Sequence, residues 1–249
     1  MTRRIAMWSG PRNISTAMMR SFENRPDCQV VDEPFYAAYL ARTGLNHPMR
    51  EAVLASQPHV WDDVVAGLER LEGPLVYEKH MTHHMLPDFG LDWMDQRTNA
   101  FLIRDPAEVL ASYVVKRAEV RLEDIGVVRQ RELFDRVADR LGTAPPVVLG
   151  ADVLENPDAM LRRLCAALEV GFSPEMLAWP AGRRDSDGVW APAWYEAVER
   201  STGFAAPERR ATPELPDALK RIADAAQPHF EGLSRYRLTF EALDSAKIS

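Results

Sequence analysis

The sequence predicts an α/β protein whose parallel central sheet is covered by helices on both faces. Two observations indicate this fold class: short apolar runs alternate with segments of helical periodicity, and each run is nearly continuous instead of alternating with polar residues. A third observation is that polar residues gather where several of these runs end. Because ligands of such folds bind at the carboxyl ends of the strands, we expect a three-layer αβα arrangement with its site at that edge.

The first predicted strand, residues 4–9, leads directly into a turn and a helix. Glycine, proline and asparagine at positions 10–13 are typical of a turn. Ser15 and Thr16 are the expected caps of the helix, whose apolar positions continue to Phe22. The helix is expected to stop at the Asn24-Arg25-Pro26 segment.

Four more strands are expected along the first two thirds of the chain. They are residues 28–32, which end at Glu33 and Pro34; 75–78, which run into a histidine cluster; 100–103, which end at Arg104, Asp105 and Pro106; and 147–149. An amphipathic helix carrying Glu108, Val109, Leu110, Tyr113 and Val114 follows the fourth strand, and Pro157 opens a helix over 158–168.

We expect one domain, residues 1–249, with a core of about residues 3–170 and a C-terminal extension or lid over 171–249. Six prolines between positions 174 and 216 divide this extension into short pieces, and it contains one clear helical pattern, from about Pro216 to Phe230. The extension should therefore be mainly loops and short helices, with a helix near its end.

The composition limits the classes of partner. A formal net charge of −7 disfavours nucleic acid and anionic membranes, although a few arginines can still bind a small anion. Cys28 and Cys165 are too few for a disulfide framework, and no apolar run approaches the ~20 residues of a membrane span. We expect a cytoplasmic protein; the sequence leaves its oligomeric state open.

The turn after the first strand has the features of a phosphate-binding loop. Residues 9–16 read SGPRNIST, and a strand-to-helix turn of this kind directs backbone N–H groups and hydroxyls at one point. The second glycine and the lysine of the triphosphatase pattern are missing, and Ala17 follows Thr16 where a further hydroxyl would be needed for Mg²⁺. The loop therefore predicts nucleotide binding of the P-loop type and is a poor candidate for kinase or ATPase chemistry, which needs a metal.

The loop Pro11, Arg12, Asn13, Ile14, Ser15, Thr16 resembles the 5'-phosphosulfate loop of sulfotransferases that use 3'-phosphoadenosine 5'-phosphosulfate (PAPS), with Ile14 in place of the family's glycine. A second, separate match lies about ninety residues later. Arg104, Asp105 and Pro106 end a strand and Ser112 follows eight residues after the arginine, which is similar to the family's 3'-phosphate site. Arg183 and Arg184 resemble the family's late basic loop, which closes over the same phosphate.

This resemblance implies PAPS as co-substrate, no metal, and a hydroxyl or amine of a small molecule as acceptor. Arg12 takes the place of the cation beside the leaving oxygen, and it would stabilise that oxygen. Two residues compete for the role of base: His80, in a segment with Lys79 that is similar to the family's lysine and histidine pair, and Glu33 at the end of the second strand.

Three alternatives stay open at this point. A metal-dependent phosphotransferase would need a second carboxylate near Thr16, and Asp32 or Asp105 could serve. A nucleotide-binding module without catalysis is favoured by Ile14. The histidines near Lys79 could form a metal site, though the absence of nearby cysteines disfavours it. The acceptor itself is not predicted, but residues 35–61 and four later aromatic residues are candidates to line its pocket: Trp179, Trp190, Trp194 and Tyr195.

Overall fold

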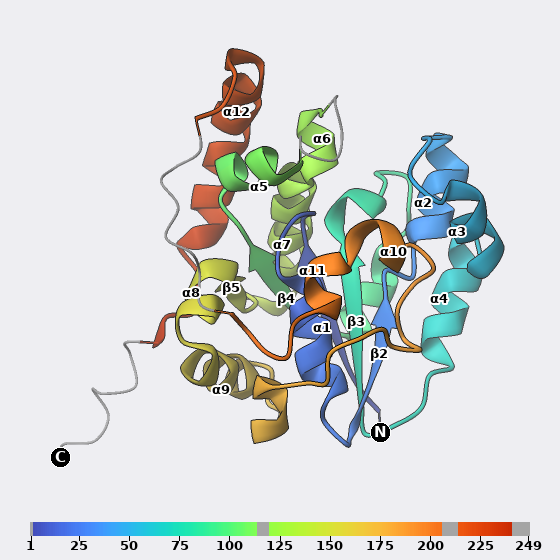
Figure 1. Ribbon diagram of the computed structural model, residues 1–249, viewed down its shortest axis with the longest axis vertical. Coiled ribbons are helices and arrows are strands. Elements are labelled where there is room, and N and C mark those ends of the chain that lie inside the picture. The colour runs from blue at the N-terminus through green and yellow to red at the C-terminus, as the bar shows by residue number, and fades with distance from the viewer. Residues whose placement is uncertain (1, 114–119, 206–213, 241–249) are drawn as a thin grey trace.

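The computed structural model describes residues 2–113, 120–205 and 214–240, and its centre is a five-stranded parallel sheet (Figure 1). The strands are β1 (Arg3–Ser9), β2 (Cys28–Asp32), β3 (Leu75–Met81), β4 (Thr98–Ile103) and β5 (Val147–Leu149). Their order across the sheet is β2-β3-β1-β4-β5, so β1 lies in the middle with β3 and β4 as neighbours. The predicted three-layer α/β class is confirmed.

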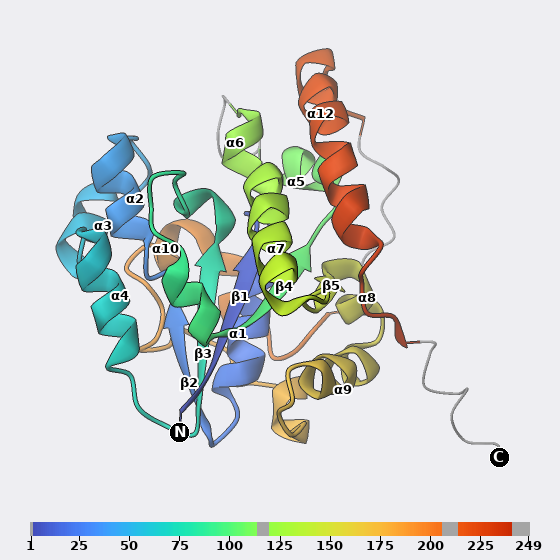
Figure 2. The same ribbon diagram turned by 180° about the vertical axis from the view of Figure 1, so that it is seen from behind.

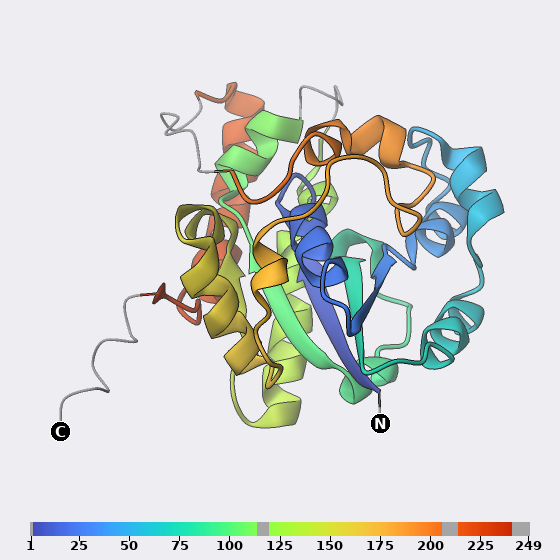
Figure 3. The ribbon, with the colours of Figure 1, turned by 60° about the horizontal axis from the view of Figure 1, so that its bottom comes forward.

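One face of the sheet is covered by two helices and a short 3-10 helix. These elements are α1 (Ser15–Glu23), α9 (Pro157–Ala167) and the short 3-10 helix η3 (Pro174–Leu177). Ile5 and Met7 of β1 point to this face and pack with Met18 and Phe22 of α1 in one apolar cluster. Figure 3 shows α1 in front of the sheet, with the C-terminal extension running across it.

The alternate residues of the same strands face the second helical layer. This layer contains α2 (Tyr36–Thr43), α4 (Trp61–Glu69), the 3-10 helix η2 (Asp92–Gln96), α7 (Val127–Leu141) and α12 (Asp217–Ser234). Ala6 and Trp8 of β1 pack here with Phe134 of α7 and Leu233 of α12. Figure 2, viewed from behind, shows α7 across the sheet with α12 beside it. Because both faces are covered, the strands are mainly apolar, as the sequence indicated.

Seven short helices complete the description. They are α3 (Arg50–Ser56), η1 (Thr82–His84), α5 (Pro106–Tyr113), α6 (Leu122–Ile125), α8 (Gly150–Glu155), α10 (Ala191–Trp194) and α11 (Glu196–Glu199). In the described ranges, none of the helices has the length and apolar character needed to cross a bilayer.

Three local expectations differ from the structure. Strand β3 continues to Met81, three residues beyond the predicted end, which places Lys79 and His80 inside the strand. The N-cap of α1 is Ile14, and neither Ser15 nor Thr16 caps it, because both already belong to the helix. Helix α12 runs to Ser234 with Pro228 in its interior, and Val114 of the predicted fourth-strand helix lies outside the described residues.

Candidate active site

A cavity of about 380 Å³ opens at the carboxyl ends of β1, β2, β3 and β4. Ten of the predicted site residues reach it: Pro11, Arg12, Asn13, Ile14, Ser15, Thr16, Glu33, Lys79, Arg104 and Ser112. Its volume lies within the range of about 300–1,000 Å³ that is usual for small-ligand sites. Three predicted site residues do not line it: His80, Arg183 and Arg184.

The loop between β1 and α1 forms one wall of the cavity and is held in a fixed shape. Arg12 has a backbone φ of 54°, a left-handed conformation that is uncommon for a residue with a side chain. The Asn13 side chain accepts a hydrogen bond from the N–H of Ile14 at 2.8 Å and donates one to the carbonyl of Leu102 at 3.3 Å. Gly10 is required by close packing, since a Cβ there would lie 2.7 Å from the carbonyl oxygen of Ile125.

Helix α1 begins at this loop with its N-terminus uncapped. Its N-cap residue, Ile14, makes no side-chain capping bond and the first turn contains no acidic residue. The first N–H groups of a helix have no partner within it, and the helix dipole adds partial positive charge there. The arrangement is therefore suited to an anion at the mouth of the loop.

The two predicted phosphate sites are in direct contact. Arg104, which follows β4, donates a hydrogen bond through Nη1 to the carbonyl oxygen of Arg12. Arg12 in turn donates through Nε to the hydroxyl of Ser112 on α5, at 3.0 Å. Arg104 also forms an ion pair with Glu108 at 3.0 Å. The guanidinium of Arg104 thus points toward the opening loop, as a single ligand spanning both sites requires.

The two arginines create an excess of positive charge beside the cavity. Burial and the nearby positive charge of Arg104 lower the pKa of Arg12 below its usual range. An anion bound between two guanidinium groups relieves this repulsion and accepts charge-assisted hydrogen bonds from both. Backbone donors, hydroxyls and paired cations on one wall are the donor set that two phosphate groups require.

The opposite wall carries a buried charged cluster. Lys79 Nζ lies 2.8 Å from Asp32 Oδ1, 2.7 Å from Glu33 Oε1 and 2.6 Å from the hydroxyl of Tyr195. Glu33 is the first residue after β2 and has a φ of 41°, the second strained non-glycine residue at this cavity. Strain at residues that line a cavity is typical of a functional site.

The cluster sets the ionisation of its members. Burial raises the pKa of Glu33, and the neighbouring charge of Asp32 raises it further. Although burial alone would lower the pKa of Lys79, its two carboxylate partners raise it well above its usual value. Lys79 therefore stays protonated, and Glu33 is more basic than an exposed glutamate.

His80 lies on the other side of the sheet, because successive side chains of a strand point to opposite faces. Its ring stacks on Trp8 at 4.5 Å between centroids, and Nε2 lies 3.0 Å from Glu78 Oε2. Burial lowers the pKa of His80 below that of free histidine. The predicted role of His80 as base has no support from this position.

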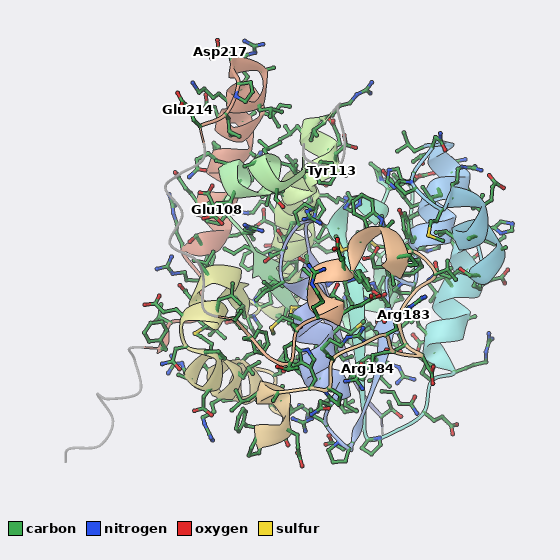
Figure 4. All side chains as sticks on the ribbon, in the orientation of Figure 1. Glu108, Tyr113, Arg183, Arg184, Glu214 and Asp217 are labelled. Atoms are coloured by element: carbon green, nitrogen blue, oxygen red, sulfur yellow. The ribbon has the colours of Figure 1, made fainter. Side chains whose placement is uncertain are left out.

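The late basic loop is also placed away from the cavity. Arg183 pairs with Glu199 at 3.8 Å, and Arg184 lies 3.9 Å from Glu23 of α1. In Figure 4 both arginines lie on the extension below Tyr113, the α5 residue that lines the cavity. The structure does not place either arginine at the cavity that Arg104 and Ser112 line.

The extension instead contributes aromatic residues. Trp194 and Tyr195 line the cavity, whereas Trp190 and Trp179 are buried, the latter against Phe204. Sequence reasoning named Tyr195 only as a possible wall of an acceptor pocket and missed its contact with Lys79. No local pattern could have revealed that contact, because the two residues are 116 positions apart.

The described part of the chain contains no group of three or more histidine, cysteine, aspartate or glutamate side chains arranged to hold a metal ion. The two carboxylates considered for a metal have other partners. Asp32 binds Lys79 and Tyr195, and Asp105 accepts hydrogen bonds from the N–H groups of Ala107 and Glu108 at the start of α5.

A parallel sheet whose central first strand leads through a tight loop into a helix, with a cavity at the carboxyl ends of its strands, defines a three-layer α/β protein. The family model "Sulfotransferase domain" matches residues 3–235, and the chain therefore belongs to the sulfotransferase-domain family.

Two curated relatives and two solved structures are similar to this chain. Branched-chain-amino-acid aminotransferase-like proteins 1 and 2 of Arabidopsis thaliana are 38% and 36% identical over 208 residues, which is 82% of this chain and 37% of each relative. The chain thus spans little more than a third of their length. A sulfotransferase from Alicyclobacillus acidocaldarius has 13% identity and a TM-score of 0.57 over 95% of this chain and 97% of that one. The sulfotransferase domain from the curacin biosynthetic pathway has 18% identity and a TM-score of 0.52 over 91% and 98%. At these identities the solved structures show a shared fold.

Proposed function

We propose that this chain transfers a sulfuryl group from PAPS to a hydroxyl or amine of a small-molecule acceptor. The observation that carries the proposal is the cavity that joins the loop of residues 11–16, Arg104 and Ser112 on one side to Glu33 and Lys79 on the other. An anionic donor and a base for an acceptor can meet in one such space.

The donor would be held at both of its charged ends. The loop and the N-terminus of α1 provide N–H groups and hydroxyls for the 5'-phosphosulfate, while Arg104 and Ser112 provide the contacts for the 3'-phosphate. Arg12 already contacts the 3'-phosphate residues through Ser112, so it bridges the two regions. Ile14, which stands where the family has a glycine, makes no side-chain capping bond. The N–H groups at the start of α1 are therefore available for the phosphosulfate.

Glu33 is the base in this proposal. As sulfur bonds to the acceptor atom, the bond between sulfur and the bridging phosphate oxygen breaks, and the acceptor's proton passes to the Glu33 carboxylate. Arg12 stabilises the negative charge that develops on the leaving oxygen, since its guanidinium remains charged. Lys79 holds Glu33 in place at 2.7 Å.

A metal-dependent phosphotransferase is the competing function. It requires carboxylates or hydroxyls free to hold Mg²⁺ beside two adjacent phosphates, and Asp32 and Asp105 are already engaged with Lys79 and with the start of α5. The residues near the loop therefore favour positioned cations over a bound metal as the source of positive charge.

Titration calorimetry tests the donor class. The protein should bind 3',5'-adenosine bisphosphate more tightly than ATP with Mg²⁺, and Arg104→Ala should lose at least tenfold in affinity for the bisphosphate. Arg162→Ala is the matched control, because Arg162 and Asp158 form an exposed i,i+4 pair like that of Arg104 and Glu108. Tighter binding of ATP with Mg²⁺, unaffected by Arg104→Ala, would refute the proposal.

Turnover is measured separately with ³⁵S-labelled PAPS and a panel of small alcohols, phenols and amines. Transfer of label to an acceptor supports the enzyme. Binding of the bisphosphate with no transfer to any member, and no acceptor-dependent release of label, would favour a binding module without catalysis.

A further inference from the structure

The segment from Asp187 to Tyr195 is fixed to the core at several points. Asp187, whose side chain is fully buried, pairs with Arg20 of α1 at 2.6 Å. The N–H of Gly188 donates to Asp32 Oδ2 at 3.1 Å. Trp190 is 1% exposed and packs edge-on against Tyr36 of α2 at 5.1 Å between centroids. This part of the extension is thus built into the edge of the sheet beside the cavity.

Tyr195 brings this segment into the charged cluster. Its hydroxyl lies 2.9 and 2.7 Å from the two oxygens of Asp32 and 3.5 Å from Glu33 Oε1. It accepts hydrogen bonds from Lys79 Nζ at 2.6 Å and from Trp190 Nε1 at 3.0 Å. With two bonds accepted, its single proton is donated to the closer carboxylate, that of Asp32.

Hydrogen-bond accounting separates the roles of the other members. The ammonium of Lys79 has three N–H donors, and Asp32, Glu33 and Tyr195 use all three. Lys79 can offer nothing to a substrate without losing one of these bonds. Glu33 differs, because its hydrogen bond from Lys79 and its 3.5 Å contact with the Tyr195 hydroxyl both involve Oε1. Among the described residues, Oε2 has no hydrogen-bond partner, and Glu33 lines the cavity.

We propose that Tyr195 is a positioning residue, which holds the Glu33 carboxylate toward the cavity through Lys79 and Asp32, so that the extension completes the active site. This inference rests on the proposed role of Glu33 as base. It assigns no contact with the reacting atoms to Tyr195, whose effect passes through Lys79. The extension then contributes a residue that fixes the base, in addition to covering the cavity.

Gly188 allows the close packing that the contact between Trp190 and Tyr195 requires. A Cβ at this position would lie 2.1 Å from the ring of Trp190, so only glycine allows the indole to lie where it donates to Tyr195. The same glycine donates its N–H to Asp32. Gly188 therefore binds Asp32 directly and leaves room for the Trp190 indole that donates to Tyr195.

Several ionisable groups face Glu33 and affect its titration. Asp32 comes from β2, Lys79 from β3 and Tyr195 from the extension, while the rest of the cavity wall carries Arg12, His47, His83, His84 and Arg104. The negative charge of Asp32 raises the pKa of Glu33, while the positive charge of Lys79 lowers it. Removal of the Tyr195 hydroxyl takes a donor from Asp32 and an acceptor from Lys79, which leaves both carboxylates less stabilised in their charged forms.

The test is a ¹³C NMR titration of glutamate side-chain carboxyls, in which the Glu33 signal is identified by its absence in Glu33→Gln. Tyr195→Phe should raise the apparent pKa of this signal by about one unit, a tenfold change in the protonation equilibrium. Tyr77→Phe is the matched control: Tyr77 is buried two positions before Lys79, and its hydroxyl has no hydrogen-bond partner in the described part of the chain. The control should leave the Glu33 signal unchanged.

The same variants are then assayed for turnover. Tyr195→Phe should move the acid limb of the kcat/KM profile to higher pH and lower kcat, with the affinity for 3',5'-adenosine bisphosphate within about twofold of wild type. Trp190→Phe, which removes only the indole donor, should shift the Glu33 titration less and in the same direction. An unshifted Glu33 titration in folded Tyr195→Phe, or in Trp190→Phe if the first variant does not fold, overturns the inference. Because this titration needs no nucleotide, absence of bisphosphate binding would count against the proposed function alone.

Discussion

Replacement of Lys79 by methionine removes the one cation in the buried cluster and keeps most of the side-chain volume. Lys79 is 1% exposed and contacts two carboxylates at 2.8 and 2.7 Å. Removal of one partner of a buried ion pair leaves charge uncompensated and costs about 3–5 kcal/mol. Lys79→Met should therefore lower the free energy of unfolding by that amount near neutral pH.

The loss should depend on pH in a defined direction. Burial and the charge of Asp32 raise the folded pKa of Glu33, and removal of Lys79 takes away the cation that opposes this rise. The folded state then binds protons that the unfolded state releases, so stability is lost as pH rises from the unfolded pKa of about 4 through the raised folded value. The penalty should be largest near pH 8 and smaller near pH 5, where protonation relieves it.

Urea unfolding followed by circular dichroism measures this penalty. At an m-value of about 3 kcal/mol/M, the midpoint should fall by roughly 1–2 M near pH 8. Lys220→Met is the matched control, since Lys220 is exposed and its pair with Asp217 at 3.7 Å should contribute less than about 1 kcal/mol. A loss of less than about 1 kcal/mol for Lys79→Met, or a loss that does not change with pH, would refute the reasoning.

Three further variants separate the proposed roles. Glu33→Gln should lower kcat by about 10²–10⁴-fold and leave bisphosphate affinity unchanged in calorimetry; a kcat near wild type would remove Glu33 as the base. His80→Gln should cost about 1–3 kcal/mol in chemical unfolding through its buried bond to Glu78, while the acid limb of the rate profile stays in place; a displaced limb would return His80 to the catalytic group. Gly188→Ala should lower the free energy of unfolding by about 1–3 kcal/mol, because Trp190 must move, and it should therefore lower the thermal midpoint. An unchanged midpoint in scanning fluorimetry would contradict the close packing.

The sheet was predictable because helices cover both of its faces and each strand contains an apolar run. The sequence did not indicate which residues of β3 point to which face of the sheet, because all seven residues of this strand are buried. Because the strand has no alternation of polar and apolar residues, the sequence predicts its end at Glu78 and places Lys79 and His80 together in the histidine cluster after it. The structure extends the strand to Met81, and the period of two then sends Lys79 to the cavity and His80 to the opposite face.

The loop and the Arg104–Ser112 spacing were visible because their chemistry lies in short segments at strand ends. Tyr195 was not, because it lies between two four-residue helices in a proline-rich segment, and its partners Lys79 and Asp32 lie more than 100 positions earlier in the sequence. Arg183 and Arg184 show the reverse case. Their local pattern matched a phosphate loop, but nearby carboxylates, including Glu23 and Glu199, pair with them away from the cavity.

The central claim is that Arg104 holds the 3'-phosphate of the nucleotide whose other end lies in the loop. Calorimetry with adenosine 5'-monophosphate and with 3',5'-adenosine bisphosphate, on wild type and on Arg104→Ala, tests it directly. The account predicts that the bisphosphate binds wild type at least tenfold more tightly than the monophosphate, and that this advantage largely disappears in the variant. An equal loss for both nucleotides, or no advantage of the bisphosphate in wild type, would contradict it.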